Sequence, residues 1–250
     1  MSGSDFDMNT DEAWEEWGRR DPYFGVITDP KYRRSAMSEA DKREFFESGR
    51  WHVSYVMRTI HDYIDRDFHP RSVLDFGCGV GRTLVSFAQI ANRAVGLDVS
   101  VSMLDEARRN CQERELQNVQ FVLSDDALSS LTEPVDLIHS CIVFQHIAAD
   151  RGRQIFGNLL KHLAPRGIGA FHLLYSKSRY ADTHGIAPPT NLRVAAPTPR
   201  PPGADPEIQM NPYNLNEILF LMQSAGVRCF HTDFTDHGGE LGVFLFFQIG

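Results

Sequence analysis

The chain has 250 residues and a mass of 28.3 kDa, with 42% hydrophobic and 23% charged residues. This length provides one large domain or two small ones, and it can bury a core without disulfides or metal. The composition excludes a chain that is disordered throughout. The 25 basic and 33 acidic residues give a net charge of −8, which disfavours a protein that binds nucleic acid through a broad basic face.

The cysteines and the N-terminus suggest the cellular compartment. Cys78, Cys111, Cys141 and Cys229 form no CxxC pair and no zinc-ligand spacing. We therefore expect reduced thiols in a cytoplasmic protein, with no metal site. Residues 1–17 are acidic without an apolar signal core, and no apolar run reaches the roughly 18 residues that a membrane span needs. Monomer and homodimer remain open.

Residues 1–70 predict a helical cap or lid that belongs to the same domain as the rest. Their apolar residues follow helical spacing and show no strand alternation. Three helices are expected: one capped by Asn9 or Thr10 and ended by Asp21-Pro22, one beginning at Ser38 with Asp41 at the capping-box position, and one over Arg50–Asp65.

From residue 71 onward, strands alternate with helices. This alternation is typical of a parallel sheet with helices on both faces. The expected strands are Ser72–Phe76, Ala94–Leu97, Val119–Leu123, Val135–Ser140 and Ile168–Leu174, and the expected helices are Thr83–Ala91, Ser100–Arg114 and Asp150–Leu163.

The C-terminal part predicts a different arrangement. Asn214 caps a helix that Gly226 ends. Val227–Asp233 and Leu241–Ile249 then form two strands without a helix between them, which favours an antiparallel hairpin. The fold class is therefore α/β: a doubly wound, mostly parallel, Rossmann-like sheet of seven strands with a C-terminal antiparallel hairpin, over residues 71–250.

The segment 176–212 interrupts this pattern and holds eight of the 13 prolines. A loop of this length inside a domain is usually functional or disordered. We expect it to form one wall of a substrate pocket, or to act as a spacer or dimer arm. The cap would supply the other wall, or simply pack its aromatic side chains on the sheet. The candidate substrate-binding residues are Tyr23, Phe24, Tyr175, Tyr180 and His184.

The sharpest motif is VLDFGCGVGRT at residues 73–83. Gly77, Gly79 and Gly81 stand between a strand and a helix, where glycine lets the backbone turn tightly and approach a ligand at the helix N-terminus. Their G-x-G-x-G spacing differs from the dinucleotide fingerprint G-x-G-x-x-G. Asp75 would repel a pyrophosphate and attract a sulfonium, so the motif favours a cationic nucleoside.

Acidic residues follow the next two strands. Asp98 ends the second strand, where a carboxylate can accept hydrogen bonds from two ribose hydroxyls. Asp125-Asp126-Ala127 follow the third strand, where an acid can accept a hydrogen bond from an adenine amino group. Alternatively, Asp125 and Asp126 are solvent-exposed carboxylates of a loop.

In this order, the motifs resemble those of the class I S-adenosylmethionine-dependent methyltransferases. Residues 73–83 resemble the first motif, Asp98 the ribose acid, Ser124-Asp125 the adenine-side acid, residues 136–147 the fourth-strand motif and residues 227–249 the added antiparallel edge. Residues 11–50, with WGRRDPYFGV and FFESG, resemble the leader of bacterial small-molecule methyltransferases often found with sugar-polymer genes.

This resemblance implies S-adenosyl-L-methionine as the cofactor and methyl transfer as the activity. It implies that Cys141 lies on the methyl side of the site. The cofactor-binding residues that we expect are Asp75, Gly77, Cys78, Gly79, Gly81, Asp98, Val99, Met103, Asp125, Asp126, Ala127 and Cys141.

Two histidines are candidate general bases, His146 first and His172 second, although either could be structural. We expect a small-molecule or glycan-like acceptor that is methylated at oxygen, because a base matters most for a hydroxyl. No NPPY-like tetrapeptide follows the fourth strand, unlike in enzymes that methylate nucleobase amino groups. The sequence leaves two alternatives: an NAD(P)-dependent oxidoreductase, or a non-catalytic regulator that binds S-adenosylmethionine.

Overall fold

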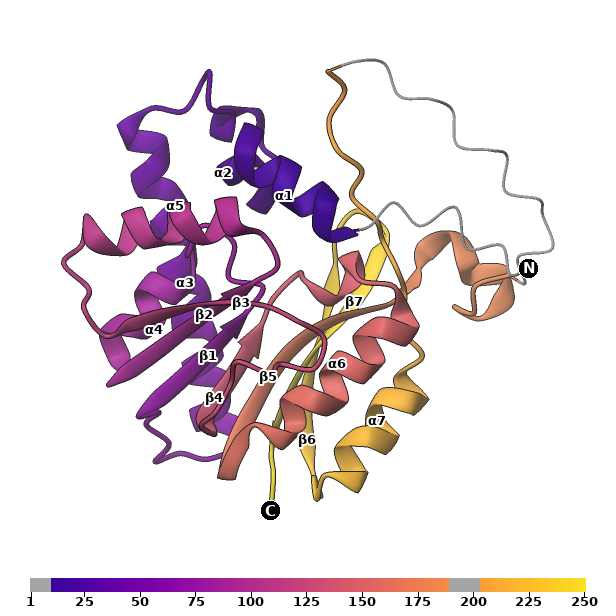
Figure 1. Cartoon of the computed structure of the whole chain (residues 1–250). Coiled ribbons are helices and arrows are strands. Elements are labelled where there is room, and N and C mark those ends of the chain that lie inside the picture. The colour runs from indigo at the N-terminus through magenta and orange to yellow at the C-terminus, as the bar shows by residue number, and fades with distance from the viewer. Residues whose placement is uncertain (1–9, 189–202) are drawn as a thin grey trace.

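The structure, a computed structural model, describes residues 10–188 and 203–250, and its centre is a seven-stranded sheet of order β3-β2-β1-β4-β5-β7-β6 (Figure 1). Strands β1 to β5 pair in parallel, and β7 pairs antiparallel with both β5 and β6. The predicted doubly wound sheet with a C-terminal hairpin is thereby confirmed. The strands are β1 (Ser72–Phe76), β2 (Arg93–Asp98), β3 (Val119–Leu123), β4 (Val135–Ser140), β5 (Leu163–Lys177), β6 (Phe230–Asp236) and β7 (Glu240–Gln248).

Helices cover both faces of the sheet, because successive side chains of a strand point to opposite sides. On the near face in Figure 1, α6 (Ala149–Lys161) and α7 (Leu215–Ser224) pack on Leu74 and Phe76 of β1. On the other face, α3 (Glu39–Tyr63) and α4 (Leu84–Ile90) cover Val73. Helix α5 (Val101–Gln112) lies beside α4 and packs against it through Leu104.

Helix α3 corrects the prediction of two separate helices over residues 38–65. It is one helix of 25 residues, and Ser38 and Asp41 form the expected capping box at its start. Gly49 lies inside it and not at a break. A Cβ atom at this position would collide with the carbonyl oxygen of Arg82. The absence of a side chain at Gly49 therefore lets α3 pack closely against the loop after β1. Nothing in the sequence ends the helix at this position.

Residues 10–32, which we call the leader, pack across α5. They comprise α1 (Thr10–Arg20), α2 (Pro22–Val26) and the 3₁₀ turn η1 (Pro30–Tyr32). Thr10 lies within α1, and its hydroxyl donates to the carbonyl of His146 at 2.8 Å. The alternative cap, Asn9, lies outside the described residues. The aromatic side chains of Trp17, Tyr23 and Tyr32 join Phe45 and Phe46 of α3 in one buried cluster.

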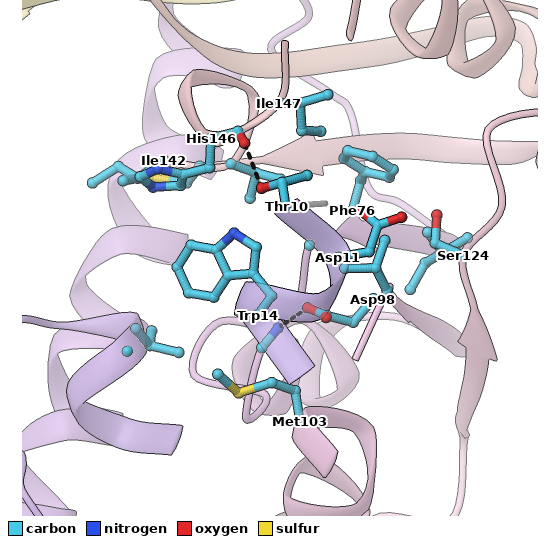
Figure 2. Close-up of a pocket in the computed structure, with 18 of the residues that line it drawn as sticks. Thr10, Asp11, Trp14, Phe76, Asp98, Met103, Ser124, Ile142, His146 and Ile147 are labelled. Atoms are coloured by element: carbon cyan, nitrogen blue, oxygen red, sulfur yellow. Dashed lines mark hydrogen bonds between the residues drawn. The ribbon is translucent and has the colours of Figure 1, made fainter. Parts of the chain in front are cut away.

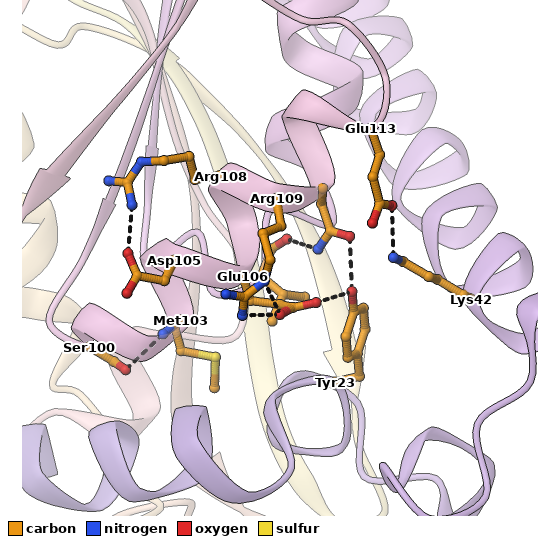
Figure 3. Close-up of polar contacts among 11 residues, drawn as sticks. Tyr23, Lys42, Ser100, Met103, Asp105, Glu106, Arg108, Arg109 and Glu113 are labelled. Carbon is orange, nitrogen blue, oxygen red and sulfur yellow. Dashed lines mark hydrogen bonds and ion pairs between the residues drawn. The ribbon is translucent and has the colours of Figure 1, made fainter.

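Polar contacts fix the leader to α5 (Figure 3). The Tyr23 hydroxyl lies 2.7 Å from Glu106 Oε1 and 2.9 Å from Asn110 Oδ1. At the other end of α5, Glu15 accepts hydrogen bonds from Ser100 and Ser102. The leader therefore docks on both ends of α5.

Part of the Pro-rich segment returns to the leader. The Arg20 guanidinium donates to the carbonyl of Ala204 at 2.7 Å, and Arg33 pairs with Asp205. The Asn211 N–H donates to the carbonyl of Gln145 at 2.7 Å. Residues 189–202 of the segment lie outside the described residues. No helix in the described part of the chain combines the length and the apolar character that a membrane crossing requires.

Candidate functional site

A cavity of about 350 Å³ opens at the carboxyl edge of β1, β2, β3 and β4. The crevice at the strand carboxyl ends is where open α/β sheets bind their ligands. The strand ends and the loops after them form the floor, and the leader contributes Thr10, Asp11 and Trp14 (Figure 2). The site is thus built from the sheet edge and from a separate N-terminal segment.

The glycine loop after β1 presents its backbone to this cavity. Gly77 and Gly79 line it, and both have positive φ angles, +71° and +53°. A Cβ atom at Gly77 would collide with Val143, and one at Gly79 would lie 2.8 Å from Val26. Glycine is therefore required at these two positions for the loop to pass between β4 and the leader.

Two other residues of the motif lie outside the cavity, although we expected them in it. Gly81 has a φ of +85° and faces Ala107 of α5, so it serves the packing of the loop against that helix. Cys78 is buried in the cluster formed by α4 and α5. Burial raises the pKa of its thiol, which is consistent with a packing role.

Asp98, at the end of β2, is buried and lines the cavity. Its Oδ2 accepts from the Gly79 N–H at 2.8 Å, and its Oδ1 accepts from the Ser100 N–H at 2.9 Å. Burial raises the pKa of this carboxyl to about 6, although the hydrogen bonds from Ser100 and Gly79 oppose the rise. Each oxygen keeps a second acceptor position, so the ionised group can bind further donors.

Asp75 corrects our expectation of a cofactor-facing carboxylate. It is 2% exposed and lies beneath the loop, outside the cavity lining. Its Oδ1 is 2.7 Å from His139 Nδ1, and its Oδ2 accepts from the Thr83 hydroxyl at 2.7 Å. A buried carboxylate must be hydrogen-bonded or paired, and these two partners hold Asp75 inside the sheet.

On the β3 side, Ser124 and Asp126 line the cavity, whereas Asp125 and Ala127 do not. Asp125 instead accepts from the Ser129 N–H at 2.9 Å, which turns it into the following loop. Asp126 pairs with Arg151 at 2.8 Å. Asp125 and Asp126 therefore have different surroundings. The sequence did not indicate which of the two would line the cavity.

Arg151 of α6 joins three parts of the site. It pairs with Asp126 after β3, and its guanidinium binds Asp11 of α1 through two contacts of 2.8 Å each. Planar two-contact pairing is a strong and directional arginine interaction. The arginine thus ties the leader to the sheet edge.

Three further predicted residues, Val99, Met103 and Cys141, line the cavity as expected. Burial raises the pKa of Cys141 to about 11, so it remains a neutral thiol at pH 7. In Figure 2, the Trp14 indole projects between His146 and Met103.

His146 lies in the 3₁₀ turn η2 (Phe144–His146), after β4, and lines the cavity. Its ring centroid is 5.1 Å from that of Trp14, and its Nδ1 is 2.8 Å from the carbonyl oxygen of Gln209. Because a carbonyl only accepts, Nδ1 carries the proton of this hydrogen bond. Burial lowers the pKa of His146, against the opposing hydrogen bonds to Gln209 and Ile142, so the imidazole is neutral at pH 7.

His172, the second candidate base, is not part of this cavity. It is buried in β5, and its Nε2 lies 2.8 Å from the Thr235 hydroxyl of β6. Burial lowers its pKa to about 4. Its position in the middle of β5 and away from the strand end explains its absence from the cavity.

The five expected acceptor-binding residues also lie outside the cavity lining. Tyr23 is held by Glu106 and Asn110 in the leader–α5 contact, and Phe24 lies under the Arg33 guanidinium. Tyr175 contacts Phe234 of β6. Tyr180 and His184 belong to or follow the turn η3 (Ser178–Thr183). Tyr23, Phe24 and Tyr175 therefore make contacts within the fold, whereas His184 is exposed.

The cavity also contains residues that sequence reasoning missed. Arg82 and Val143 lie within the two motifs that we recognised, and their positions close to Gly81 and Cys141 could have indicated them. The leader residues carry no local signal, because their place depends on docking against α5. The missed lining residues are Thr10, Asp11, Trp14, Gly25, Val26, Ile27, Ser48, Phe76, Arg82, Leu97, Ile142, Val143, Ile147, Arg151 and Ile155.

Residues 73–167 match a family model described as a methyltransferase domain. The 23S rRNA (uracil(1939)-C(5))-methyltransferase RlmD of Marinomonas posidonica is 33% identical over 100 residues, 39% of this chain and 22% of that protein. The probable S-adenosyl-L-methionine-dependent methyltransferase TehB of Haemophilus influenzae is 29% identical over 126 residues, 48% of this chain and 42% of that protein. The chain matches less than half the length of each relative.

The fold resembles the crystal structure of the magnesium protoporphyrin IX methyltransferase of Synechocystis PCC 6803 with bound S-adenosylhomocysteine. The TM-score is 0.63 at 18% identity, over 96% of this chain and 97% of the other. The sequence match over residues 73–167 and the shared fold agree with the resemblance to the class I methyltransferases. The match over residues 73–167 favours the predicted methyltransferase over the oxidoreductase.

The residues of the cavity fit this cofactor. Gly77 and Gly79 of the glycine loop line the cavity, and Asp98 lines it from the adjacent strand end. Asp98 has acceptor positions left for hydroxyl donors. Apolar side chains such as Val99 and Met103 supply the surface that a nucleoside base requires.

Proposed function

We propose that this chain transfers a methyl group from S-adenosylmethionine to a hydroxyl of a small-molecule or glycan-like acceptor. The observation that carries the proposal is the roof over the cavity. The leader lies over the sheet edge, and residues 203–211 pack beside it at Arg20, Arg33 and Gln145. Such a roof suits a compact acceptor better than a long polymer strand. The net charge of −8 also disfavours a nucleic acid.

Different residues of the cavity would bind different parts of the cofactor. We propose that the backbone of Gly77 and Gly79 contacts the amino-acid part of the cofactor and that Asp98 accepts hydrogen bonds from the two ribose hydroxyls. Ser124 and Asp126 would then lie on the adenine side. Hydrogen bonds to a charged group contribute about 1.5–3 kcal/mol each. Asp98 would thus supply much of the specificity for a ribose.

When bound, the cofactor supplies a methyl group that its sulfonium already activates. The protein must therefore orient the acceptor, exclude water and remove one proton. We propose that Trp14 and the leader limit the access of water to the reacting atoms. Rigid placement of these atoms can contribute about 7–11 kcal/mol. We propose that His146 accepts the acceptor proton at Nε2, because Nδ1–H is engaged by the carbonyl of Gln209.

A methyl-transfer screen tests the activity. The protein and tritiated S-adenosylmethionine are incubated with fractions of a bacterial small-molecule extract and, separately, with total RNA. We expect label in small-molecule fractions, and mass analysis then identifies the methylated atom. Label in RNA alone would contradict the proposed acceptor class. Binding of the cofactor without transfer to any fraction would favour the non-catalytic regulator.

His146→Gln tests the base. We expect kcat to fall by about 10²–10⁴-fold, which is the usual contribution of a positioned base. The affinity for S-adenosylhomocysteine should stay within threefold, because the variant keeps the shape of the cavity. His69→Gln, at an exposed histidine before β1, is the matched control. Full turnover in His146→Gln would show that the base lies elsewhere or that the reaction needs none.

A further inference from the structure

Arg82 is a charged side chain that the proposed reaction does not yet use. It directly follows Gly81, lines the cavity and is half-buried. Its backbone and stem lie against α3 at Gly49, where a Cβ atom would collide with the Arg82 carbonyl and approach Cγ to 3.1 Å. Its Nη1 donates to the Ser48 hydroxyl at 3.4 Å. The packing of α3 therefore holds this side chain at the cavity wall.

The guanidinium has no acidic partner among the described residues, since no carboxylate oxygen there lies within 4.0 Å of it. The other arginine in the lining, Arg151, is paired with Asp11 and with Asp126. The carboxylate of the same motif, Asp75, is already engaged by His139 and Thr83. A partly buried cation without a counter-charge is costly, and it is typical of a site where an anion binds.

The charge of Arg82 acts inside the cavity. Burial raises the pKa of the Cys141 thiol, and the positive charge of Arg82 partly opposes this rise. Cys141 follows the end of β4 and lines the same wall. The guanidinium is therefore close to the part of the cavity that the β4 edge bounds, away from Asp126 and Arg151.

We propose that Arg82, with Ser48 beside it, forms a subsite that binds a carboxylate. The planar fork of arginine matches the two oxygens of a carboxylate. The Ser48 hydroxyl donates to the Phe45 carbonyl at 2.6 Å and accepts from Arg82 Nη1, so it helps to orient the guanidinium. This inference rests on the proposed function. Two sources offer this chemistry: the carboxylate of the methionine part of the cofactor, or a carboxylate on the acceptor.

Two ligands distinguish these sources. S-adenosylhomocysteine carries the amino-acid carboxylate, and 5′-methylthioadenosine has the same nucleoside without it. Both are titrated calorimetrically into the wild type and into Arg82→Gln at pH 7.5. If the cofactor supplies the carboxylate, Arg82→Gln weakens S-adenosylhomocysteine at least tenfold and changes 5′-methylthioadenosine less than twofold. Arg82→Lys should recover part of the loss, because it keeps the charge without the fork.

A second arm tests the acceptor source. Benzoate is titrated into wild-type protein saturated with S-adenosylhomocysteine, and binding is followed by saturation-transfer NMR. If the acceptor supplies the carboxylate, the wild type binds benzoate and Arg82→Gln does not. The wild type and Arg82→Gln then have the same affinity for S-adenosylhomocysteine. Arg58→Gln, at an exposed arginine of α3, is the control, and melting temperatures verify that each variant is folded.

Unchanged affinities in both arms would overturn the carboxylate subsite while leaving the proposed function intact. Failure of the wild type to bind S-adenosylhomocysteine would instead contradict the proposed function itself.

Discussion

A single carboxylate, that of Asp98, links the chemistry of the pocket to its stability. Its raised pKa of about 6 means that the unliganded fold favours the protonated form relative to the unfolded chain. The unliganded protein therefore loses stability from this group as the pH rises through about 6. A ligand with hydroxyl donors at this position would stabilise the buried charge. The ionised Asp98 carboxylate would therefore destabilise the unliganded protein and stabilise the liganded one.

We expect the affinity for S-adenosylhomocysteine to fall as the pH drops below 6, by about tenfold for each further pH unit. The reason is that the ligand hydroxyls would bind the ionised carboxylate, whose pKa is about 6 without ligand. Calorimetric titration between pH 5 and 8 measures this dependence. Asp98→Asn should bind at least tenfold more weakly at pH 8 and show a flat profile. Asp125→Asn, outside the cavity, should match the wild type.

Among the elements, the contact between α1 and α5 sets the position of the leader. Gly18 of α1 lies so close to α5 that a Cβ atom there would be 2.7 Å from Ser100 Oγ. Glu15 accepts from Ser100 Oγ and Ser102 Oγ at 2.7 Å each, and from the Ser102 N–H at 3.1 Å. A carboxylate at a helix N-terminus also interacts favourably with the helix dipole. This side chain therefore helps to hold α1, with Trp14, over the cavity.

Glu15→Ala should release the leader without unfolding the sheet. We expect trypsin to cleave after Arg19 or Arg20 at least fivefold faster than in the wild type, with a change in melting temperature below that of core variants. Glu12→Ala, at an exposed residue of the same helix, is the control. Equal cleavage rates in the two variants would mean that other contacts hold the leader.

The same contact has a defined pH range. Burial alone would raise the pKa of Glu15, but the hydrogen bonds from Ser102, Ser100 and Arg19 outweigh it and lower the pKa to about 2. The contact therefore stabilises the leader fully above the ordinary glutamate value of 4.5, and this stabilisation is lost as the pH falls toward 2. Solvent screens part of the effect, because the side chain is 23% exposed.

At the scale of the whole molecule, the site joins segments that are far apart in the chain. Arg151 of α6 binds Asp11 of the leader, and Asn211 binds the carbonyl of Gln145 beside His146. A ligand that contacts the strand ends and the leader together would therefore stabilise the fold as a unit.

Saturating S-adenosylhomocysteine should raise the melting temperature of the protein. At about 100 times its dissociation constant, the ligand adds roughly 2.7 kcal/mol of stability. For a domain of this size, that corresponds to about 5–10 °C, which differential scanning fluorimetry detects readily. NADH at the same concentration should cause no shift. Absence of a shift with millimolar S-adenosylhomocysteine would contradict the assignment of the cofactor.

Local patterns predicted the fold well because its elements depend on short-range spacing. The strands Val119–Leu123 and Val135–Ser140 have the bounds that their apolar runs indicated, and Ser38 and Asn214 cap their helices as expected. The division of α3 was wrong because Gly49 is a place of contact with the loop after β1. That contact lies outside the range of any local pattern.

The amino-acid sequence by itself determined the class of the domain, the order of its elements and the floor of the pocket, including Gly77, Gly79 and Asp98. These features depend on local patterns, in which each residue acts together with its neighbours in the sequence. Only the tertiary structure decided which side chains face the pocket. Asp75 turns inward to His139, while Asp11, Trp14 and Arg82 arrive at the pocket because α1 docks on α5 and Gly49 lets α3 approach the loop. Packing between segments that are distant in the sequence sets the orientation of these side chains. The spacing of residues along the chain therefore does not predict it.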